Sequence, residues 1–288
     1  MAEQNADDSV QIKNLNLKIK ELEGRRNSVG AISPDQQVQL AEAYLERSET
    51  VPLEGGAAIP DLDAAAREYL DLWSRIDETW LPGQKYSIRG WDGDSLEITT
   101  KEEWSDELQK ELARTYTYRG MTKFYTSQQE AARQDLDKAI PILERLESDK
   151  AMGGQTTVWN AGFIMCLRNP LRMAYATRAK CPTDLATQLH DNDGFIRLWT
   201  WEVASAPPEQ LWIVALQYLQ RVDIKKKLGD SAGVVEDLQK AITILEQLCK
   251  IQPNEPSYVN KLKTTRAALL TAKGEKIGSS IAKWFKRK

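Results

Sequence analysis

The sequence predicts an all-α protein built from repeated helical hairpins. The segments Gln134–Leu146 (QDLDKAIPILERL) and Glu236–Leu248 (EDLQKAITILEQL) are identical at nine of thirteen aligned positions. They lie 102 residues apart, which is three times the 34-residue period of a common class of helical-hairpin repeat. In both segments apolar residues recur at the spacing of a helical face. We therefore expect stacked helix pairs that form a right-handed superhelix.

The first copy of the repeat reads as two closely packed helices. The first helix spans Glu111–Thr126 and contains Gly120, where a glycine costs a helix roughly 1 kcal/mol relative to alanine. The second helix begins near Gln128 and carries the small residues Ala132 and Ala139. Glycine and alanine at these places would let the two helices approach closely, with a large apolar side chain filling the seam between them.

This hairpin resembles the tetratricopeptide repeat. Five residues match the aromatic, glycine, alanine, large-apolar, alanine pattern of that family: Tyr116, Gly120, Ala132, Leu136 and Ala139. The second copy keeps Tyr218, Leu238 and Ala241, but Val222 and Val234 replace the glycine and the first alanine. The usual proline after the last alanine is absent in both copies, which resembles the long-helix variety of the repeat. The resemblance covers Glu111–Asp149 and Leu211–Thr271, about a third of the chain.

The chain before the first clear repeat divides into three segments. Residues 1–32 contain a polar start, a short helix over Val10–Glu23 with a 3,4,3 apolar spacing, and a break from Gly24. Residues 33–79 read as a first, diverged helical hairpin, opened by Ser33-Pro34 as N-cap and first turn. Residues 80–100 interrupt the helical pattern with two short alternating runs, which predict a small β-hairpin or an ordered loop with Trp91 at its tip. Thr100 and Glu103 then form a capping box for the next helix.

Residues 101–272 are expected to form the repeat array. Its middle predicts two or three helices, near Thr156–Arg168, Leu171–Lys180 and Thr183–Ala204, which Asn169-Pro170 and Cys181-Pro182 would interrupt or kink. The last helix, Ser257–Ala272, would cap the array.

Residues 273–288 form a basic tail with six basic residues and one acid. Its candidate contact residues for a membrane or a partner are Ile277, Ile281, Lys283, Trp284, Phe285, Lys286 and Arg287. The apolar members of this set share one helical face, which suits an anionic membrane surface or a partner groove. The sequence leaves three alternatives open: packing onto the array, contact with a membrane, and contact with a partner or nucleic acid.

Composition excludes several classes of protein. The net charge of −3 gives no general attraction to nucleic acid, so nucleic-acid binding is not expected. Cys166, Cys181 and Cys249 are too few and too far apart for a disulfide framework or a zinc site. A signal sequence and a long apolar segment are both absent, so a cytoplasmic protein is expected, with peripheral membrane contact through its tail as the alternative.

Nothing in the sequence favours catalysis. His190 is the only histidine, and Asp191-Asn192-Asp193-Gly194 after it reads as a solvated turn whose downstream spacing does not fit a calcium loop. The glycine pairs at 55–56 and 153–154 lack the context of a phosphate loop. We expect no catalytic residue, no metal and no cofactor. An unrecognised enzyme site within residues 155–206 remains the alternative.

The candidate partner-binding residues are Trp91 and two basic strips: Arg114, Arg119 and Lys123 in the first copy, and Lys225, Lys226 and Lys227 in the second. Each strip has the alternative of a solvated helix face. The family resemblance implies peptide binding through the first helix of each repeat. The carboxylate clamp of its chaperone-binding members is missing, because Thr117, Met121, Leu219 and Asp223 occupy the matching places. Trp199, Trp201 and Trp212 are either core anchors or the rim of a peptide groove.

These observations predict a non-catalytic adaptor that binds a protein or peptide through a helical array, with the basic tail as a second contact. A peripheral membrane protein anchored by the tail is the main alternative.

Overall fold

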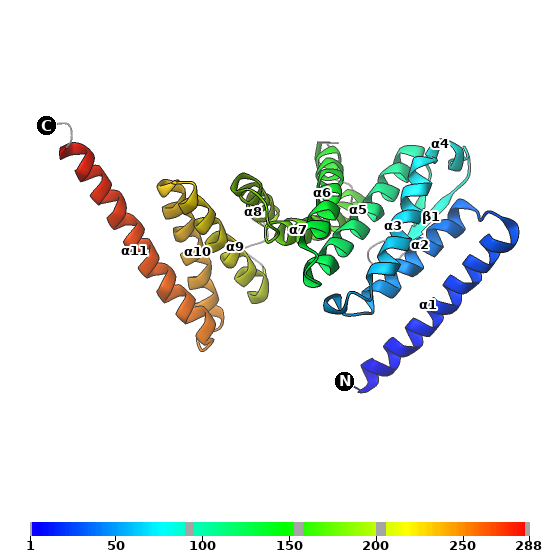
Figure 1. The fold of residues 1–288 in the computed structure, drawn as a ribbon, viewed down its shortest axis with the longest axis horizontal. Coiled ribbons are helices and arrows are strands. Elements are labelled where there is room, and N and C mark those ends of the chain that lie inside the picture. The colour runs from blue at the N-terminus through cyan, green and yellow to red at the C-terminus, as the bar shows by residue number, and fades with distance from the viewer. Residues whose placement is uncertain (1, 90–94, 153–157, 200–205, 286–288) are drawn as a thin grey trace. The chain divides into compact units, whose positions relative to one another are not determined.

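The computed structural model describes residues 2–89, 95–152, 158–199 and 206–285, with side chains at 10–28, 30–88, 97–149, 168–199 and 206–274. The chain forms two compact units, Met1–Cys181 and Pro182–Lys288, and each is considered by itself. The described part is mostly helical, which confirms the all-α class (Figure 1). The unit boundary falls inside the segment 101–272 that the sequence groups into one array.

The first unit contains most of the elements. In chain order they are α1 (Ala2–Val29), α2 (Pro34–Glu49), the 3-10 turn η1 (Leu53–Gly55), α3 (Ile59–Ser74), α4 (Ile76–Thr79), β1 (Tyr86–Arg89), β2 (Ser95–Ile98), α5 (Lys101–Tyr125), α6 (Gln129–Met152) and α7 (Val158–Arg178). The second unit contains α8 (Leu185–Trp199), α9 (Pro208–Lys227), α10 (Ser231–Ile251) and α11 (Pro256–Phe285). Helices that follow one another through a short turn pack together, as α2 with α3, α5 with α6, and α9 with α10.

The N-terminal helix is longer than the sequence indicates. Gly24 was expected to begin a break, but α1 continues through it to Val29. The glycine lies on an exposed side of the helix with no atom near its missing Cβ, so its cost is only the intrinsic helix penalty. The apolar residues Leu15, Ile19 and Leu22 are buried where α1 packs on α2. Burying each such side chain contributes about 1.5–3 kcal/mol, which outweighs that penalty.

Both expected capping motifs are present. Ser33 accepts a hydrogen bond from the backbone of Gln36, whose side chain accepts one from the Ser33 backbone in return. Thr100 and Glu103 form the same reciprocal pair at the start of α5. These local bonds fix where α2 and α5 begin.

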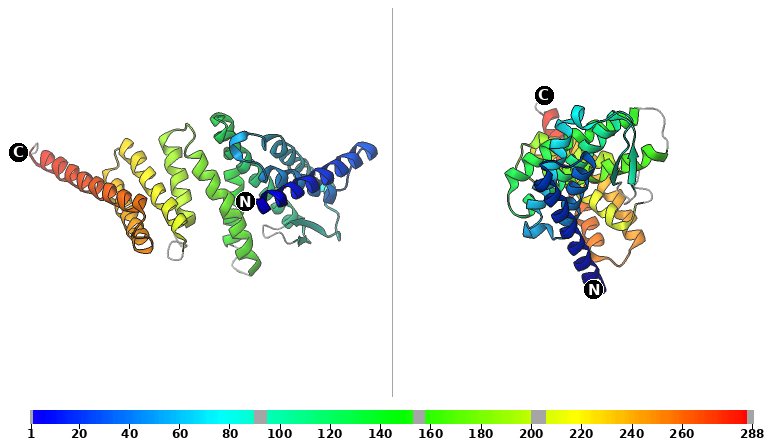
Figure 2. Two further views of the ribbon diagram at one scale, coloured as in Figure 1. Left: turned by 90° about the horizontal axis from the view of Figure 1, so that it is seen from below. Right: turned by 90° about the vertical axis from the view of Figure 1, so that its right-hand side faces the viewer.

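The insertion between α4 and α5 is an antiparallel β-hairpin, in register from Tyr86 opposite Ile98 to Arg89 opposite Ser95. Strand β1 packs against α2 at the edge of the unit (Figure 2). Tyr86 lies between Trp80 and Trp104, with ring centroids 5.0 and 4.7 Å apart. This aromatic stack fixes the hairpin to the start of α5. Trp91, at the expected tip, lies outside the described residues.

The segment around Pro170 departs from the expected helix break. Asn169-Pro170 lies inside one helix, α7, instead of separating two. An internal proline costs a helix ~3 kcal/mol or more. Burial of Leu171, Ala174 and Tyr175 in the following turn opposes that cost. The next expected helix, Thr183–Ala204, is observed as α8, and residues 200–205 lie outside the described part.

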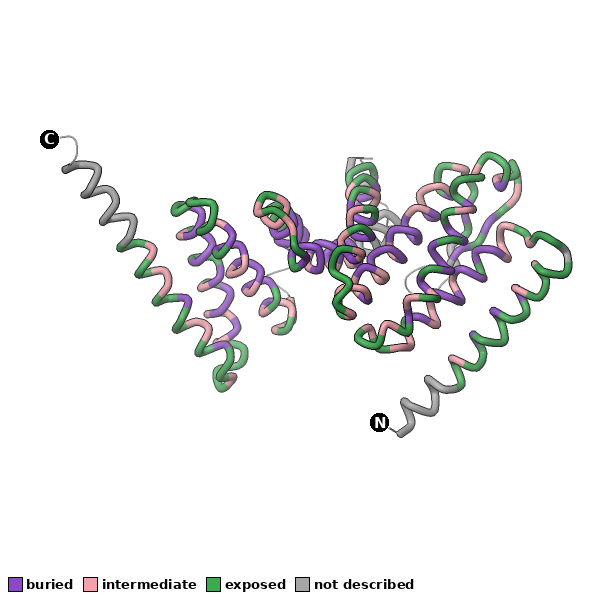
Figure 3. Tube along the Cα trace, in the orientation of Figure 1, coloured by how far each residue is buried: buried purple, intermediate pink, exposed green. Residues whose placement is uncertain are grey.

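In the second unit, α9 and α10 form a hairpin through the expected turn. Gly229 has a φ of 76°, which the glycine tolerates without strain. The small core cluster Val222, Val234 and Leu238 is covered by residues of α9 and α11, namely Leu219, Ala268, Leu269 and Ala272. In both units buried residues follow the faces along which neighbouring helices meet (Figure 3).

Gly120 provides a test of the close packing between α5 and α6. A Cβ at Gly120 would lie 2.9 Å from Cγ of Leu136 and 3.2 Å from the carbonyl oxygen of Ala132. Overpacking of this kind costs roughly 1–3 kcal/mol, so Gly120→Ala is expected to lower the free energy of unfolding by about 1 kcal/mol despite the better helix propensity of alanine.

Chemical denaturation measures this change. The matched control is Gly24→Ala, which meets no atom within 4 Å and is expected to stabilise by roughly 1 kcal/mol. If the two alanines stabilise equally, α5 and α6 do not approach as described.

Candidate functional site

An arginine on α5 joins three helices. Arg119 donates from Nε and Nη2 to the two carboxylate oxygens of Asp135 on α6, at 2.8 and 2.6 Å. Its Nη1 donates to Oδ1 of Asp63 on α3 at 2.7 Å. Lys123 adds a second cation to Asp135 at 2.8 Å. The guanidinium lies over the ring of Tyr116, 5.1 Å from its centroid.

The same arrangement recurs in the second unit. Arg221 of α9 donates from Nε and Nη2 to Asp237 of α10 at 2.8 and 2.5 Å, and from Nη1 to Asp193 of α8 at 2.6 Å. Lys225 lies 2.9 Å from Asp237, and the Tyr218 ring centroid is 5.2 Å from the guanidinium carbon. We call an arginine bound in this way, to its own hairpin and to the preceding helix, an arginine fork.

A third arginine fork lies in the first, diverged hairpin. Arg47 of α2 donates from Nε and Nη2 to Asp61 of α3 at 2.7 and 2.6 Å. Its Nη1 donates to Oδ1 of Asn16 on α1 at 2.6 Å, and its guanidinium lies 5.7 Å from the Tyr44 ring centroid. The three forks share a Tyr-x-x-Arg sequence with an aspartate 14 or 16 residues after the arginine.

Burial makes these forks important for stability. The side chains of Asp135 and Asp237 are 4% and 0% exposed. Burial alone would lower the pKa of Arg119 and Arg221, but the hydrogen bonds and charges of their aspartates outweigh it, so both pKa values are raised. Removing one partner of a buried pair strands the other charge in a poorly solvated place.

The basic strips expected from the sequence are largely used inside the fold. Arg119, Lys123 and Lys225 bind buried aspartates, as described above. Arg114 pairs with Glu49 at 2.6 Å and with Glu111 at 3.3 Å. Lys226 and Lys227 are exposed, and Lys226 lies 3.8 Å from Asp223. Their role as partner contacts stays a prediction, and most of these cations are already neutralised by the protein itself.

A buried ionic row on α5 was missed by sequence reasoning. Glu107, Lys110 and Glu111 are 3–5% exposed, and Lys110 pairs with both glutamates. Arg114 continues the row one turn later. The hydroxyl of Tyr69 on α3 is fully buried and has no hydrogen-bond partner among the described atoms, and burial raises its pKa well above the usual value. Charges at positions i, i+3, i+4 and i+7 could have indicated a polar face, but not that it is buried.

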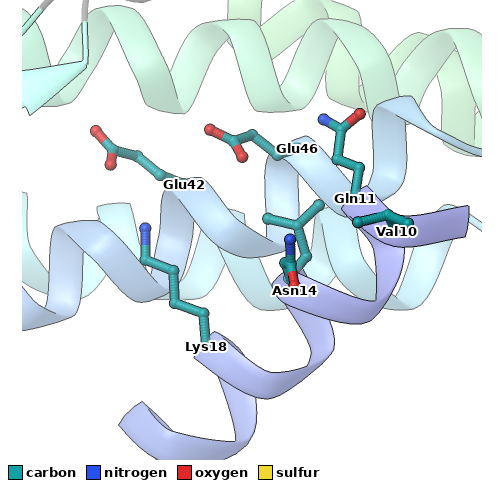
Figure 4. Close-up of a pocket in the computed structure, with 7 residues that line it drawn as sticks. Val10, Gln11, Asn14, Lys18, Glu42 and Glu46 are labelled. Carbon is teal, nitrogen blue, oxygen red and sulfur yellow. The ribbon is translucent and has the colours of Figure 1, made fainter. Parts of the chain in front are cut away.

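An open groove lies between α1 and α2, with a volume of about 510 Å³ (Figure 4). Seven residues line it: Val10, Gln11, Asn14, Leu15 and Lys18 from α1, and Glu42 and Glu46 from α2. Lys18 extends from α1 towards Glu42. The lining therefore combines an apolar edge with two acidic residues, a surface suited to an amphipathic segment with basic residues.

The contacts of α1 explain where this groove lies. Asn16 and Glu23 of α1 bind Arg47 and Tyr44 of α2. On α6, two residues with the same seven-residue separation, Asp137 and Glu144, bind Arg178 and Tyr175 of α7. The sequence Tyr-x-x-Arg is the same in α2 and α7. Helix α1 thus packs on α2 as α6, the second helix of its hairpin, packs on α7, the first helix of the next hairpin.

This correspondence identifies what the groove lacks. Helix α5 packs against both α6 and α7. On α6, Ala132 and Leu136 lie against Gly120 of α5. Their equivalents on α1, 121 residues earlier by the pairing of Asn16 with Asp137, are Gln11 and Leu15, and both line the groove. The groove on α1 and α2 therefore occupies the place that α5 fills on α6 and α7.

One stretch of the candidate enzyme region differs from the expected turn. Asp191-Asn192-Asp193-Gly194 is part of helix α8 and not a solvated turn, and Asp191 and Asn192 are fully buried. The buried side chains of Phe195, Leu198 and Trp199 hold this stretch in the helix. His190 lies exposed on α8. No group of three His, Cys, Asp or Glu side chains in the described residues is placed to hold a metal ion.

Some of the tryptophans expected as core anchors or as the rim of a groove lie in the described residues, and others do not. Trp199 is 7% exposed and belongs to the core, and Trp212 packs on Tyr258 with ring centroids 5.1 Å apart. Trp201 lies outside the described residues. The backbone of α11 is helical through Phe285, but the tail side chains expected to make contacts lie outside the described part. No family model, no curated protein and no solved structure matches the chain.

The buried forks predict large effects of removing their carboxylates. Asp237→Ala and Asp135→Ala are each expected to lower the free energy of unfolding by about 3–5 kcal/mol, because each leaves an arginine and a lysine without a buried partner. Urea denaturation followed by circular dichroism measures the loss.

The control is Glu246→Ala, which removes the exposed pair with Arg266, whose two side chains are 42% and 57% exposed. It is expected to cost less than about 1 kcal/mol. Equal effects of all three substitutions would show that the forks are no more important than surface ion pairs.

Proposed function

We propose that the protein is a non-catalytic adaptor, a tetratricopeptide-like array of helical hairpins that binds a helical segment of another protein. The recurrence of the arginine fork in three hairpins supports the repeat assignment. The close approach of α5 and α6 at Gly120 supports the resemblance to the family, whose pattern places a glycine there. The right-handed superhelix and the cytoplasmic location expected from the sequence belong to this proposal.

The groove between α1 and α2 carries the binding role. Its position is that of a first helix, so its floor is shaped for a helix and not for an extended peptide. Val10 is 58% exposed at its edge, and Leu17 on the same helix is 60% exposed. By the 121-residue offset between α1 and α6, Leu17 is equivalent to Lys138. Lys138 lies over the Tyr116 ring of α5 in the hairpin of α5 and α6. Val10 and Leu17 are seven residues apart and so share one face of α1, and two exposed apolar residues on one face favour a partner that covers them.

A matched pair of substitutions tests the groove. Asn14 is exposed and lines it, so Asn14→Arg places a long cation in the groove without disturbing the core. Asn27→Arg makes the same change on an exposed part of α1 outside the lining and serves as control. Affinity purification is expected to recover a partner with wild type and Asn27→Arg, with at least a roughly tenfold loss for Asn14→Arg, equivalent to about 1.4 kcal/mol.

Cross-linking followed by mass spectrometry locates that partner on the protein. Cross-links are expected at Lys18 and at other lysines of α1. Equal recovery with all three proteins, or cross-links confined to the second unit, would contradict the assignment of the groove.

A second candidate function is contact with an anionic membrane through residues 273–288. The observation that favours it is the helical backbone of α11 through Phe285, which brings Ile277, Ile281, Trp284 and Phe285 onto one face. Basic residues beside such a face favour an interfacial helix. In the described residues, no helix combines the length and the apolar character needed to cross a bilayer.

Co-sedimentation with phosphatidylserine-containing vesicles tests this second function. The double substitution Trp284→Ala, Phe285→Ala is expected to abolish most sedimentation, because it removes the two largest apolar groups of the face. Trp73→Ala, at a tryptophan that is 36% exposed on α3, is the control and should sediment like wild type. Equal sedimentation of all three proteins would remove the membrane role.

A further inference from the structure

Helix α11 packs in the described residues as a first helix does, on the second helix of the hairpin before it. Glu246 of α10 is equivalent to Glu144 of α6 by the 102-residue offset. Glu144 binds Tyr175 of the following first helix, and Glu246 binds Arg266 of α11 at 2.7 Å. Helix α11 therefore packs on α10 as a first helix packs on the preceding hairpin. In the described residues no further helix pairs with it.

The exposed side chains of α11 include both apolar and basic residues. Val259 and Leu270 are 46% and 73% exposed, and Leu270 has the largest exposed fraction among the exposed large apolar side chains of the described residues. Lys263 and Lys273 are exposed near them. The span 256–274 contains four basic residues and no acidic one. Its exposed face thus offers apolar contact together with positive charge.

The groove of the first unit has the complementary features. Its lining offers the exposed Val10 as an apolar contact and carries Glu42 and Glu46 against Lys18, the one cation of the lining. A helix seated there would pack on α1 and α2 as α5 packs on α6 and α7. Among the described residues, α1 is a second helix without the first helix of its own hairpin, and α11 is a first helix without the second helix of its own hairpin.

We infer that α11 of one molecule docks in the groove between α1 and α2 of a second molecule, where α11 and α1 complete a helical hairpin. This inference rests on the proposed docking role of the groove and names a second copy of this chain as the occupant. The two surfaces differ, so the contact is heterologous, and a docked pair of molecules retains one free groove and one free α11. Association therefore continues head to tail into open chains of molecules and does not stop at a symmetric dimer.

Sedimentation velocity and light scattering of the purified full-length protein test the inference. Wild type is expected to exceed the monomer mass of 32.6 kDa and to grow further as its concentration rises. Asn14→Arg in the groove and Leu270→Asp on α11 should each stay monomeric. The matched controls Asn27→Arg and Leu228→Asp, both at exposed positions outside the two surfaces, should associate like wild type. Circular dichroism shows whether each variant is folded.

Mixing the two single variants gives the decisive result. Asn14→Arg retains an intact α11, and Leu270→Asp retains an intact groove, so an equimolar mixture is expected to regain association with a mass roughly twice that of either variant alone. A wild type that is monomeric at every concentration, association that survives both substitutions, or a mixture that stays monomeric would each overturn the inference.

The proposed function fails by a different observation. If wild type is monomeric while partner capture still depends on Asn14, the groove binds another protein and only the self-association is wrong. If partner capture is indifferent to Asn14→Arg, the proposed function itself is wrong.

Discussion

The guanidinium of a first-helix arginine ties its own helix to two neighbouring helices, in the first unit and again in the second. Arg119 binds Asp135 within its own hairpin and Asp63 on the preceding helix. Arg221 does the same with Asp237 and Asp193. A planar cation with five donors can satisfy two acceptors on different helices at once, which a lysine cannot do with the same geometry. Hairpin closure and hairpin stacking therefore depend on a single side chain in each copy.

This use of charge determines where binding can occur. The cations that looked available on the first helices are held by buried aspartates, and releasing them would cost several kcal/mol. Binding is more favourable where the packing pattern is interrupted, because no internal pair has to break there. The groove beside α1 and the exposed side of α11 near Leu270 are two such places, and Val10 and Leu270 remain exposed there.

Local sequence signals predicted local structure well. Gly120 opposite Leu136, the capping boxes at Ser33 and Thr100, and the β-hairpin before α5 all depend on residues near one another in the chain. Features set by distant contacts were not predictable in this way. Gly24 and Pro170 remain helical because burial elsewhere in their helices outweighs their local penalties, and Asp191 is buried although its neighbours suggest a turn. The groove was missed because its two walls are separated by a turn and its significance appears only by comparison with α5, α6 and α7.

The third fork had a signal, Tyr44-x-x-Arg47 followed by Asp61, that resembles the two clear copies.

Hydrogen exchange of an Arg221→Met variant tests the connecting role of the arginine most directly. Methionine keeps the apolar stem but removes every donor. Peptides from α8, α9 and α10 are expected to lose protection together, because Arg221 binds Asp193 and Asp237 on the helices that flank its own. Loss of protection confined to α9, with α8 and α10 unchanged, would show that the fork does not hold the three helices together.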